Sequence, residues 1–527
     1  MKHTNSKRIL ALLMTLVLVV GLLAACGSAD QNAQETTSAA GKKVLYAGSL
    51  GNFGAINLDP AEGWNGWFLS FYGVAETLFK QSNSYDAVPC LVESYEEPED
   101  GVTWKLTLRD DVYFSNGEKM TAQSVVDCFT RTLSENERGA DTLVVSEMSA
   151  DGQVLTLVTP TADPTFLYSL TDPLLSVYYV GEDQDYANKS FCTGPFVVKS
   201  FVRETEAVVV KNENYWGGDV KIDEAHLITF TDEDAMVMAM QNGELNHIDG
   251  TAAALLVCNE STGFHVQSAA TSRAEKFVFN YKDSDYGSDP VIRQVIALSV
   301  DRDGYAKASN GTKIANYGIY PATLTYGDNS KLDIQITGQD LEKAAKVLDD
   351  ANYLDSDGDG IREKDGKPIS LTLVSATNMG IQDFADVLAS DLKSIGIELN
   401  TQTYENLDSF ETFAGVKWDF CIEGKYMTPT GDASYFFDQD VVTNGSCNYG
   451  GYSNPELDKL AAQLHQTFDP DERNELVFQM EQMLLDDFSF IVYCNGTNTY
   501  ITDQSVTGYE PNPSNYYFMD ANMDLVQ

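Results

Sequence analysis

The stretch DAVPCLVESYEEPEDGVTWKLTLRDDVYFSNGEKMTAQSVVDCFTRTL, residues 86–133, carries the densest structural signals in the chain. Residues 102–109 alternate between apolar and polar side chains, which predicts a half-buried strand. Asn116-Gly117 predicts a tight turn, and Thr121 is placed to cap a helix that runs to residue 133. A strand, a turn and a helix are therefore expected in immediate succession.

The same alternation of short apolar strands with helices continues on both sides of this stretch. Further strands are expected at 43–48, 277–280, 370–374, 397–399, 418–422 and 490–494. Helical spacing of apolar residues predicts helices at 291–298, 341–350, 383–395 and 472–485. Alternating helices and strands favour an α/β fold built on central sheets.

The N-terminus has the pattern of an export signal. Lys2, Lys7 and Arg8 precede an apolar run, 9–23, that is too short to span a bilayer, which indicates a secretory signal peptide. Ala24-Ala25 before Cys26 is similar to a bacterial lipoprotein signal, in which the cysteine is lipidated and becomes the mature N-terminus. An ordinary signal peptide with a chance cysteine is the alternative, and the position of Cys26 at the end of the apolar run favours the lipoprotein.

The residues after Cys26 predict a protein that is exported and anchored. Residues 26–41 are small and polar, as in a flexible tether, and order is expected from residue 42. We therefore expect a signal peptide at 1–25, a tether at 26–41, and a folded body held at the extracytoplasmic face of a cell membrane by acyl chains on Cys26.

Composition excludes several classes of function. The 527 residues include 34 Lys+Arg and 79 Asp+Glu, a formal net charge of −45, so nucleic acid is a poor partner. An acidic ligand would need a locally cationic site. A solvated acidic surface is enough to explain the net charge. The 8 cysteines form no CxxC pair and predict no zinc site; we interpret them as small core residues, and a disulfide remains open.

Several short motifs follow one another in a family-specific order. They are the run from Trp104 through Asn116-Gly117-Glu118 to the Thr121 helix, Thr193-Gly194-Pro195-Phe196, Asn214-Tyr215-Trp216-Gly217-Gly218, and Met240 to Glu244 with Ile248-Asp249. Together they resemble the large solute-binding proteins of peptide and nickel ABC importers, solute-binding protein family 5. The resemblance spans nearly the whole chain after the signal peptide.

The resemblance implies a two-lobe, type II periplasmic-binding-protein-like α/β fold with a hinge of two crossing segments. We place the hinge segments near 273–281 and 488–500. The expected division is lobe I at 42–272 with an inserted subdomain at about 76–190, lobe II at 273–494, and a return to lobe I at 495–527. Such a hinge lets the lobes close on a ligand.

Enzyme signatures are missing from the sequence. The 5 histidines include no HExxH spacing, and neither a GxSxG elbow nor a P-loop is present. We therefore expect no catalytic residue, no enzyme and no cofactor. An extracellular peptide hydrolase on the same scaffold and a ligand receptor for signalling are the alternatives.

One acidic run resembles the start of a calcium-binding loop. Asp355, Asp357 and Asp359 stand at alternate positions before Gly360, but the twelfth position, where a bidentate acid is needed, is Gly366. Glu363 falls at the ninth position. An acidic hairpin turn is the favoured interpretation, and no metal site is assigned.

The candidate ligand-binding residues combine arginines with aromatic and loop residues. An anionic ligand in so acidic a protein needs the paired N–H donors of an arginine guanidinium. Arg138 and Arg273 fall in regions that face the cleft in this family. For each, a surface ion pair is an equal alternative. The others lie in loops rich in Pro, Gly, Asn and aromatic residues: Trp64, Trp67, Tyr426, Thr430, Gly431, Asp432, Asn448 and Tyr449. For Trp64 and Trp67, packing in the core is the default interpretation.

These loops resemble the nickel and metallophore branch more than the general peptide branch. No histidine occurs in the loop around Tyr426, so a metal would arrive already chelated. The expected function is a lipid-anchored, monomeric solute-binding subunit of an ABC importer, with permease subunits as partners. Its ligand is a short peptide or a peptide-like nickel chelate, captured by lobe closure.

Overall fold

The computed structural model describes residues 41–51, 53–181, 184–376, 382–404 and 415–526. The chain divides into two compact units, Met1–Lys43 and Val44–Gln527, and the fold below is that of the second unit. The predicted signal peptide, the lipidation site Cys26 and all of the predicted tether except Gly41 lie outside the described residues.

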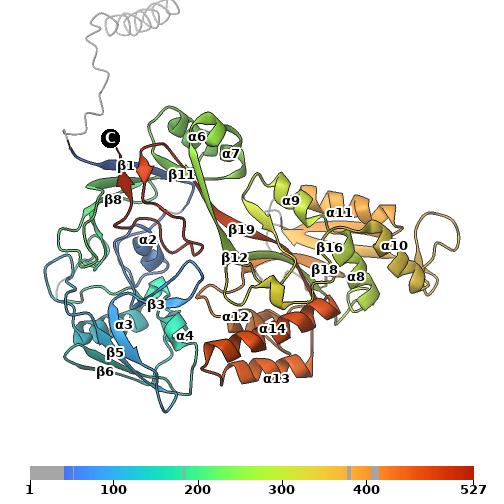
Figure 1. The fold of residues 1–527 in the computed structure, drawn as a ribbon, viewed down its shortest axis with the longest axis horizontal. Helices are drawn as coiled ribbons and strands as arrows, with labels where there is room; N and C mark the ends of the chain where they lie inside the picture. Colours follow the sequence, from blue (N-terminus) through green and yellow to red (C-terminus); the bar gives the residue numbers. More distant parts are fainter. Residues whose placement is uncertain (1–40, 52, 182–183, 377–381, 405–414, 527) are drawn as a thin grey trace, which may run out of the picture. The chain divides into compact units, whose positions relative to one another are not determined.

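A mixed sheet of eleven strands runs through the second unit (Figure 1). Its strands, in spatial order, are β17 (Glu398–Tyr404), β16 (Ser370–Ala376), β18 (Phe420–Tyr426), β12 (His265–Phe279), β19 (Phe490–Thr502), β11 (His247–Asp249), β1 (Val44–Ser49), β10 (Glu224–Thr229), β9 (Glu206–Lys211) and β8 (Phe196–Val202), with β13 (Lys313–Ala315) also paired to β19. The predicted strands at 43–48, 370–374, 418–422 and 490–494 all lie in this sheet.

Two long antiparallel strands, β12 and β19, join the two halves of the sheet (Figure 1). The register pairs His265 with Thr502 at one end and Val278 with Phe490 at the other. The register shifts between Ala270 and Ala274, so three residues of β12 leave the regular ladder there. Both predicted hinge segments overlap these strands, while the exact lobe boundaries stay a prediction.

Residues 86–133 form the elements expected of them. The strand is β5 (Thr103–Leu108), in a four-stranded sheet ordered β4 (Val92–Glu96), β5, β7 (Val154–Val158) and β6 (Glu147–Asp151). The helix is α3 (Ala122–Glu135), and Thr121 forms a capping box with Ser124. Gly117 has a φ of +89°, as the tight turn requires.

The four long helices predicted from apolar spacing are present. They are α8 (Pro290–Ser299), α10 (Leu341–Asp350), α11 (Gln382–Ser394) and α14 (Pro470–Asp487). Asp289 and Asp469 cap α8 and α14 just before a proline, which explains where these helices begin. The other helices are α2 (Asn65–Phe71), α4 (Gly139–Thr142), α5 (Phe166–Ser169), α6 (Glu233–Gln241), α7 (Ala252–Val257), α9 (Arg302–Ala308), α12 (Ser434–Phe436) and α13 (Pro455–Leu464), with a π-helical turn, η6 (Phe437–Val441).

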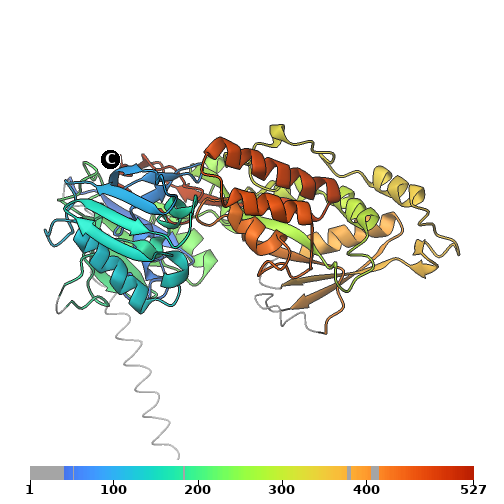
Figure 2. The same ribbon diagram turned by 90° about the horizontal axis from the view of Figure 1, so that it is seen from below.

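Helices cover both faces of the sheet around β12 (Figure 2). Successive side chains of a strand point to opposite faces. Phe277 therefore packs in one apolar cluster with Phe384 of α11, while Val278 packs in another with Met480 of α14. In Figure 2 the red helices α13 and α14 lie on one side of the strands.

The described cysteines support the interpretation as core residues. All seven are free thiols, and six of them are buried. The described part of the chain contains no helix that combines the length and apolarity needed to cross a bilayer.

Candidate functional site

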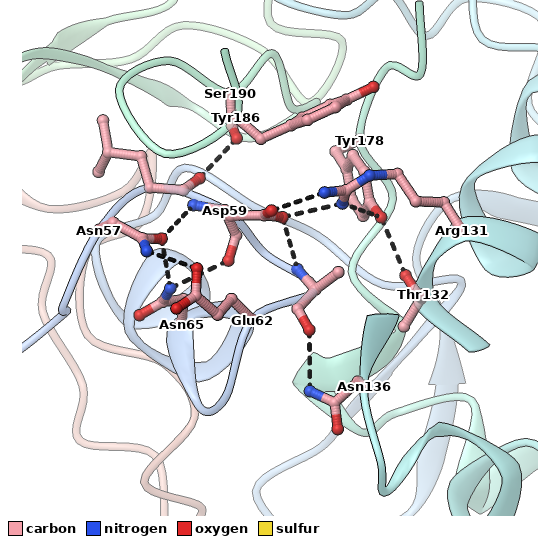
Figure 3. A network of polar contacts seen from close by, with 12 residues as sticks. Asn57, Asp59, Glu62, Asn65, Arg131, Thr132, Asn136, Tyr178, Tyr186 and Ser190 are labelled. Atoms are coloured by element: carbon pink, nitrogen blue, oxygen red, sulfur yellow. Dashed lines mark hydrogen bonds and ion pairs between the residues drawn. The ribbon is translucent and has the colours of Figure 1, made fainter. Parts of the chain in front are cut away.

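A network of polar contacts fixes the loop that carries Trp64 (Figure 3). The Arg131 guanidinium donates to both carboxylate oxygens of Asp59, at 2.9 and 2.6 Å, and to the Tyr178 hydroxyl at 2.9 Å. It also lies over the ring of Tyr186, 3.9 Å from the centroid. Because Arg131 belongs to α3, these bonds attach the loop to the helix.

Asn136, at the end of α3, fixes the residues just before Trp64. Its amide donates to the carbonyls of Ala61 at 2.9 Å and Gly63 at 3.1 Å (Figure 3 draws the first). On the other side, α2 packs closely on the backbone, since a Cβ at Gly66 would lie 2.3 Å from the Pro173 carbonyl oxygen. The loop therefore has little freedom to move.

Trp64 and Arg138 form one aromatic and cationic pair at this loop. The Cζ of Arg138 lies 3.6 Å from the centroid of a Trp64 ring that is 62% exposed. The guanidinium also donates to the Gly63 carbonyl at 3.3 Å. Trp67 differs, because its half-buried ring stacks on Phe71 with centroids 5.7 Å apart.

Arg273 and Tyr426 form a second such pair. They face each other in the register of β12 and β18, and the Cζ of Arg273 lies 5.6 Å from the Tyr426 ring centroid. Arg273 is exposed and sits where β12 leaves the β19 ladder. The neighbouring Ser272 N–H donates to the Tyr85 hydroxyl at 3.0 Å, which fixes the irregular segment.

The loop 426–432 packs against residues from the first half of the chain. Gln81 Nε2 donates to the Pro429 carbonyl at 2.7 Å, and Thr171 Oγ1 lies 3.5 Å from the Thr430 carbonyl. Gly431 has a φ of +103°, and a Cβ there would lie 2.1 Å from the Tyr85 carbonyl oxygen. Glycine is therefore required at this contact.

Asp172 lies within electrostatic reach of Arg138, and Tyr516 within reach of Asp172 and Tyr426; neither Asp172 nor Tyr516 was predicted from the sequence. Burial raises the pKa of Asp172, while its bond from the Leu174 N–H and the charge of Arg138 lower it. Burial also raises the pKa of Tyr516, and the charge of Asp172 and the nearby Tyr426 act in the same direction. The N-capping Asp172-Pro173 pair was the only sequence signal available.

Two predicted ligand residues support the loops from inside the protein. The buried Asp432 carboxylate pairs with Arg473 and accepts the Ser434 N–H at 2.8 Å. The buried Asn448 donates to the carbonyls of Val442 and Tyr452. Both side chains are thus engaged in holding their own segments.

Tyr449 lies in a different neighbourhood from Arg138 and Arg273. Burial raises its pKa, and its contacts with Cys447 and the charges of Glu423 and Asp440 act in the same direction. Asp440 belongs to a buried charge cluster in which Lys276 contacts both Glu423 and Asp440, and Lys425 pairs with Asp440.

Three arginines of the described chain, Arg138, Arg273 and Arg302, have no ion pair with a carboxylate. Six others pair with a carboxylate: Arg109, Arg131, Arg203, Arg293, Arg362 and Arg473. Arg302 is buried and donates to the carbonyls of Ala297 and Val492. Arg138 and Arg273 thus combine the lack of a carboxylate partner with an aromatic neighbour, and a guanidinium of this kind can bind an anionic group.

The acidic run at 355–359 forms a turn before the hairpin of β14 (Glu363–Lys364) and β15 (Lys367–Pro368). Ligand atoms of Asp355, Asp357 and Glu363 lie within 4.8 Å of one another. Asp355 accepts the N–H groups of Gly358 and Gly360, and Asp359 accepts that of Ile361. The carboxylates therefore stabilise the turn, and we assign no metal to it.

Comparison with known proteins gives a consistent result. Residues 86–446 match the family model described as bacterial extracellular solute-binding proteins, family 5 middle. The nickel-binding protein NikA of Staphylococcus aureus is 24% identical over 462 residues, which is 85% of this chain and 88% of NikA. The oligopeptide-binding protein AppA of Bacillus subtilis is 26% identical over 542 residues, 96% of this chain and 97% of AppA.

Among solved structures, the nickel ABC transporter protein of Bacillus halodurans superimposes with a TM-score of 0.83. It is 25% identical, and the match covers 92% of this chain and all of that one. The fold is therefore the two-lobe, type II periplasmic-binding-protein fold that the sequence predicted.

Proposed function

Because the chain belongs to the bacterial extracellular solute-binding proteins of family 5, we propose that it captures a carboxylate-bearing solute between Arg138 and Arg273 and delivers it to an ABC importer. The two lobes close about the β12 and β19 strands and bury the solute between them. Lobe I comprises 42–272 and 495–527, and lobe II comprises 273–494.

Arg138 and Arg273, the two arginines of the described chain that are neither buried nor paired with a carboxylate, carry this proposal. A guanidinium binds a carboxylate through two parallel N–H···O bonds, and Arg138 and Arg273 approach the solute from different lobes. Trp64 and Tyr426 lie against the two guanidinium groups and hold them in place. A solute with a carboxylate at each end would therefore bind best when the lobes are closed.

The relatives narrow the solute to two chemical classes. NikA of Staphylococcus aureus is named for nickel and AppA of Bacillus subtilis for oligopeptides. Both a short peptide and an amino-acid chelate of nickel carry carboxylates. In either case the arginines bind the organic part, and nickel is cargo that arrives in its chelate.

Cys26 supplies the connection to the membrane in this proposal. Acyl chains on Cys26 would hold the protein beside the permease at the extracytoplasmic face of the membrane. The folded body acts as a monomer, since one copy contains both arginines. Mass spectrometry of the intact mature protein tests the anchor: a diacyl or triacyl group on Cys26 supports it, and an unmodified N-terminus contradicts it.

Calorimetry of delipidated protein tests the binding proposal. The protein is titrated with a mixture of dipeptides to pentapeptides and, separately, with nickel and L-histidine. Arg138→Gln and Arg273→Gln should each weaken solute binding by about tenfold or more, because each removes one charged guanidinium with its paired N–H donors. Arg203→Gln, at an arginine paired with Glu204, is the matched control and should change nothing.

Two outcomes would contradict the proposal. In the first, neither class of solute binds the wild-type protein or raises its melting temperature. In the second, Arg138→Gln and Arg273→Gln bind as tightly as Arg203→Gln. Steady consumption of a peptide would instead establish the hydrolase alternative.

A further inference from the structure

A cavity of about 420 Å³ lies among α2, the hairpin of β2 (Phe79–Gln81) and β3 (Ala87–Pro89), and the segment 510–520. One of its lining residues, Gln81, also bonds to the loop 426–432. Its volume falls in the range of small-molecule sites. None of the ten predicted ligand residues lines it. Its lining residues are therefore different from those that the proposed function assigns to the solute.

Glu76 forms one wall of this cavity. The Tyr215 hydroxyl donates to one of its carboxylate oxygens at 3.0 Å, and Trp216 Nε1 donates to the other at 2.9 Å. The side chain is half-buried and lines the cavity. Each carboxylate oxygen can accept a second hydrogen bond, so the group is oriented and still able to bind a donor.

Gln81 supplies an acceptor that lacks a partner. Its side chain is 2% exposed, and its Nε2 donates to the Pro429 carbonyl and lies 3.4 Å from Thr171 Oγ1. Its Oε1 has no hydrogen-bond partner in the described chain. Leaving a buried acceptor unpaired is costly, and a donor inside the cavity would remove that cost.

The remaining lining residues favour a cation. Glu510 and Asp520 add two carboxylates, and Lys80 is the one cation among the lining residues of the described chain. Tyr517 and Phe518 add aromatic surface, which attracts ammonium and guanidinium groups, whereas Arg109 already lies over the ring of Trp216, 4.2 Å from its centroid. The cavity is thus rich in acceptors and in aromatic faces.

We propose that this cavity binds a small organic cation with an amine or guanidinium group, whose N–H donors reach Glu76, Gln81 Oε1 and the carboxylates of Glu510 and Asp520. The site does not depend on which solute binds between Arg138 and Arg273. Binding there would add a second ligand to the protein.

Calorimetry with agmatine, which carries both an amine and a guanidinium, tests the proposal on the full mature chain. We expect saturable binding of one agmatine per protein, and none of N-butylurea, its uncharged analogue. Val88→Phe, which fills the cavity, should abolish binding. Glu510→Gln should weaken it about threefold, as expected for an exposed charge. Glu93→Gln, an equal charge change on the exposed face of β4, is the control and should leave binding unchanged.

Three results would overturn the proposal: no saturable binding of agmatine at millimolar concentrations, equal binding of N-butylurea, or equal affinity in Glu510→Gln and Glu93→Gln. The last comparison holds even if Val88→Phe fails to fold. Arg138→Gln and Arg273→Gln should bind agmatine as the wild type does, so this site and the proposed solute site succeed or fail separately.

Discussion

His247 should make the free energy of unfolding fall in acid, and replacing it should remove its share of that fall. The side chain is 1% exposed and packs against the rings of Tyr500, Tyr509 and Phe518. Neither ring nitrogen has a hydrogen-bond partner in the described structure. Burial lowers the pKa of His247 to about 3, so the folded protein keeps this ring neutral.

The sign and size of the effect follow from the two pKa values. The unfolded chain, with a histidine pKa near 6.5, takes up a proton below that pH and the folded protein does not, so the free energy of unfolding falls as the pH drops. Between pH 7 and pH 5 the loss from His247 is about 2 kcal/mol, and it continues down to about pH 3. A folded pKa one unit higher would leave the loss above pH 5 nearly unchanged.

Urea denaturation at pH 7 and pH 5 measures this loss. His247→Phe removes the titrating imidazole and keeps an aromatic ring packed against the rings of Tyr500, Tyr509 and Phe518. The wild type should therefore lose about 2 kcal/mol more than His247→Phe between the two pH values. His265→Gln, at an exposed histidine, is the control and should follow the wild type. Equal losses in the wild type and His247→Phe would show that the folded protein does not hold His247 neutral.

Three further substitutions test the Asp59 network, the buried charge cluster around Asp440 and the close contact at Gly431. Arg131→Met should lower the free energy of unfolding by about 3 kcal/mol in urea denaturation, because it leaves the mostly buried Asp59 without its cation. Arg203→Met, at the exposed pair with Glu204, should cost far less, and equal costs would contradict the network. Lys276→Met should also lower the free energy of unfolding by about 3 kcal/mol, since it leaves Glu423 and Asp440 with Lys425 as their cation. An unchanged free energy of unfolding would show that the cluster adds no stability. Gly431→Ala should lower the melting temperature more than Gly117→Ala does, and it should weaken solute binding. Both glycines have a positive φ, but only at Gly431 would a Cβ lie against Tyr85. Equal effects of the two substitutions would argue against this close contact.

Local signals predicted the regular elements well. Thr121 and the alternation at 102–109 located α3 and β5, because capping and strand periodicity depend on adjacent residues. The long strand β12 was predicted only at 277–280. Its first part, HVQSAATSR, has no apolar alternation and becomes a strand through pairing with β19, a contact between segments more than two hundred residues apart in sequence.

The candidate site was predictable in composition but not in arrangement. Arg138 and Arg273 were recognised by residue type, and only the structure shows that both lack an ion pair. Asp432 and Asn448 have the residue types of a binding loop, yet the same groups equally stabilise a loop from inside, which is what their bonds to Arg473 and Tyr452 do. Asp172 and Tyr516 were missed because a helix cap and a tyrosine near the C-terminus carry no local sign of a ligand.

Native mass spectrometry can identify what the protein holds after it is mixed with peptides and nickel–histidine chelates. We expect one carboxylate-bearing solute per protein, released with its mass unchanged and absent from the Arg138→Gln/Arg273→Gln double variant. A solute without a carboxylate, one whose mass has changed, or one retained by the double variant would rule out the proposed function.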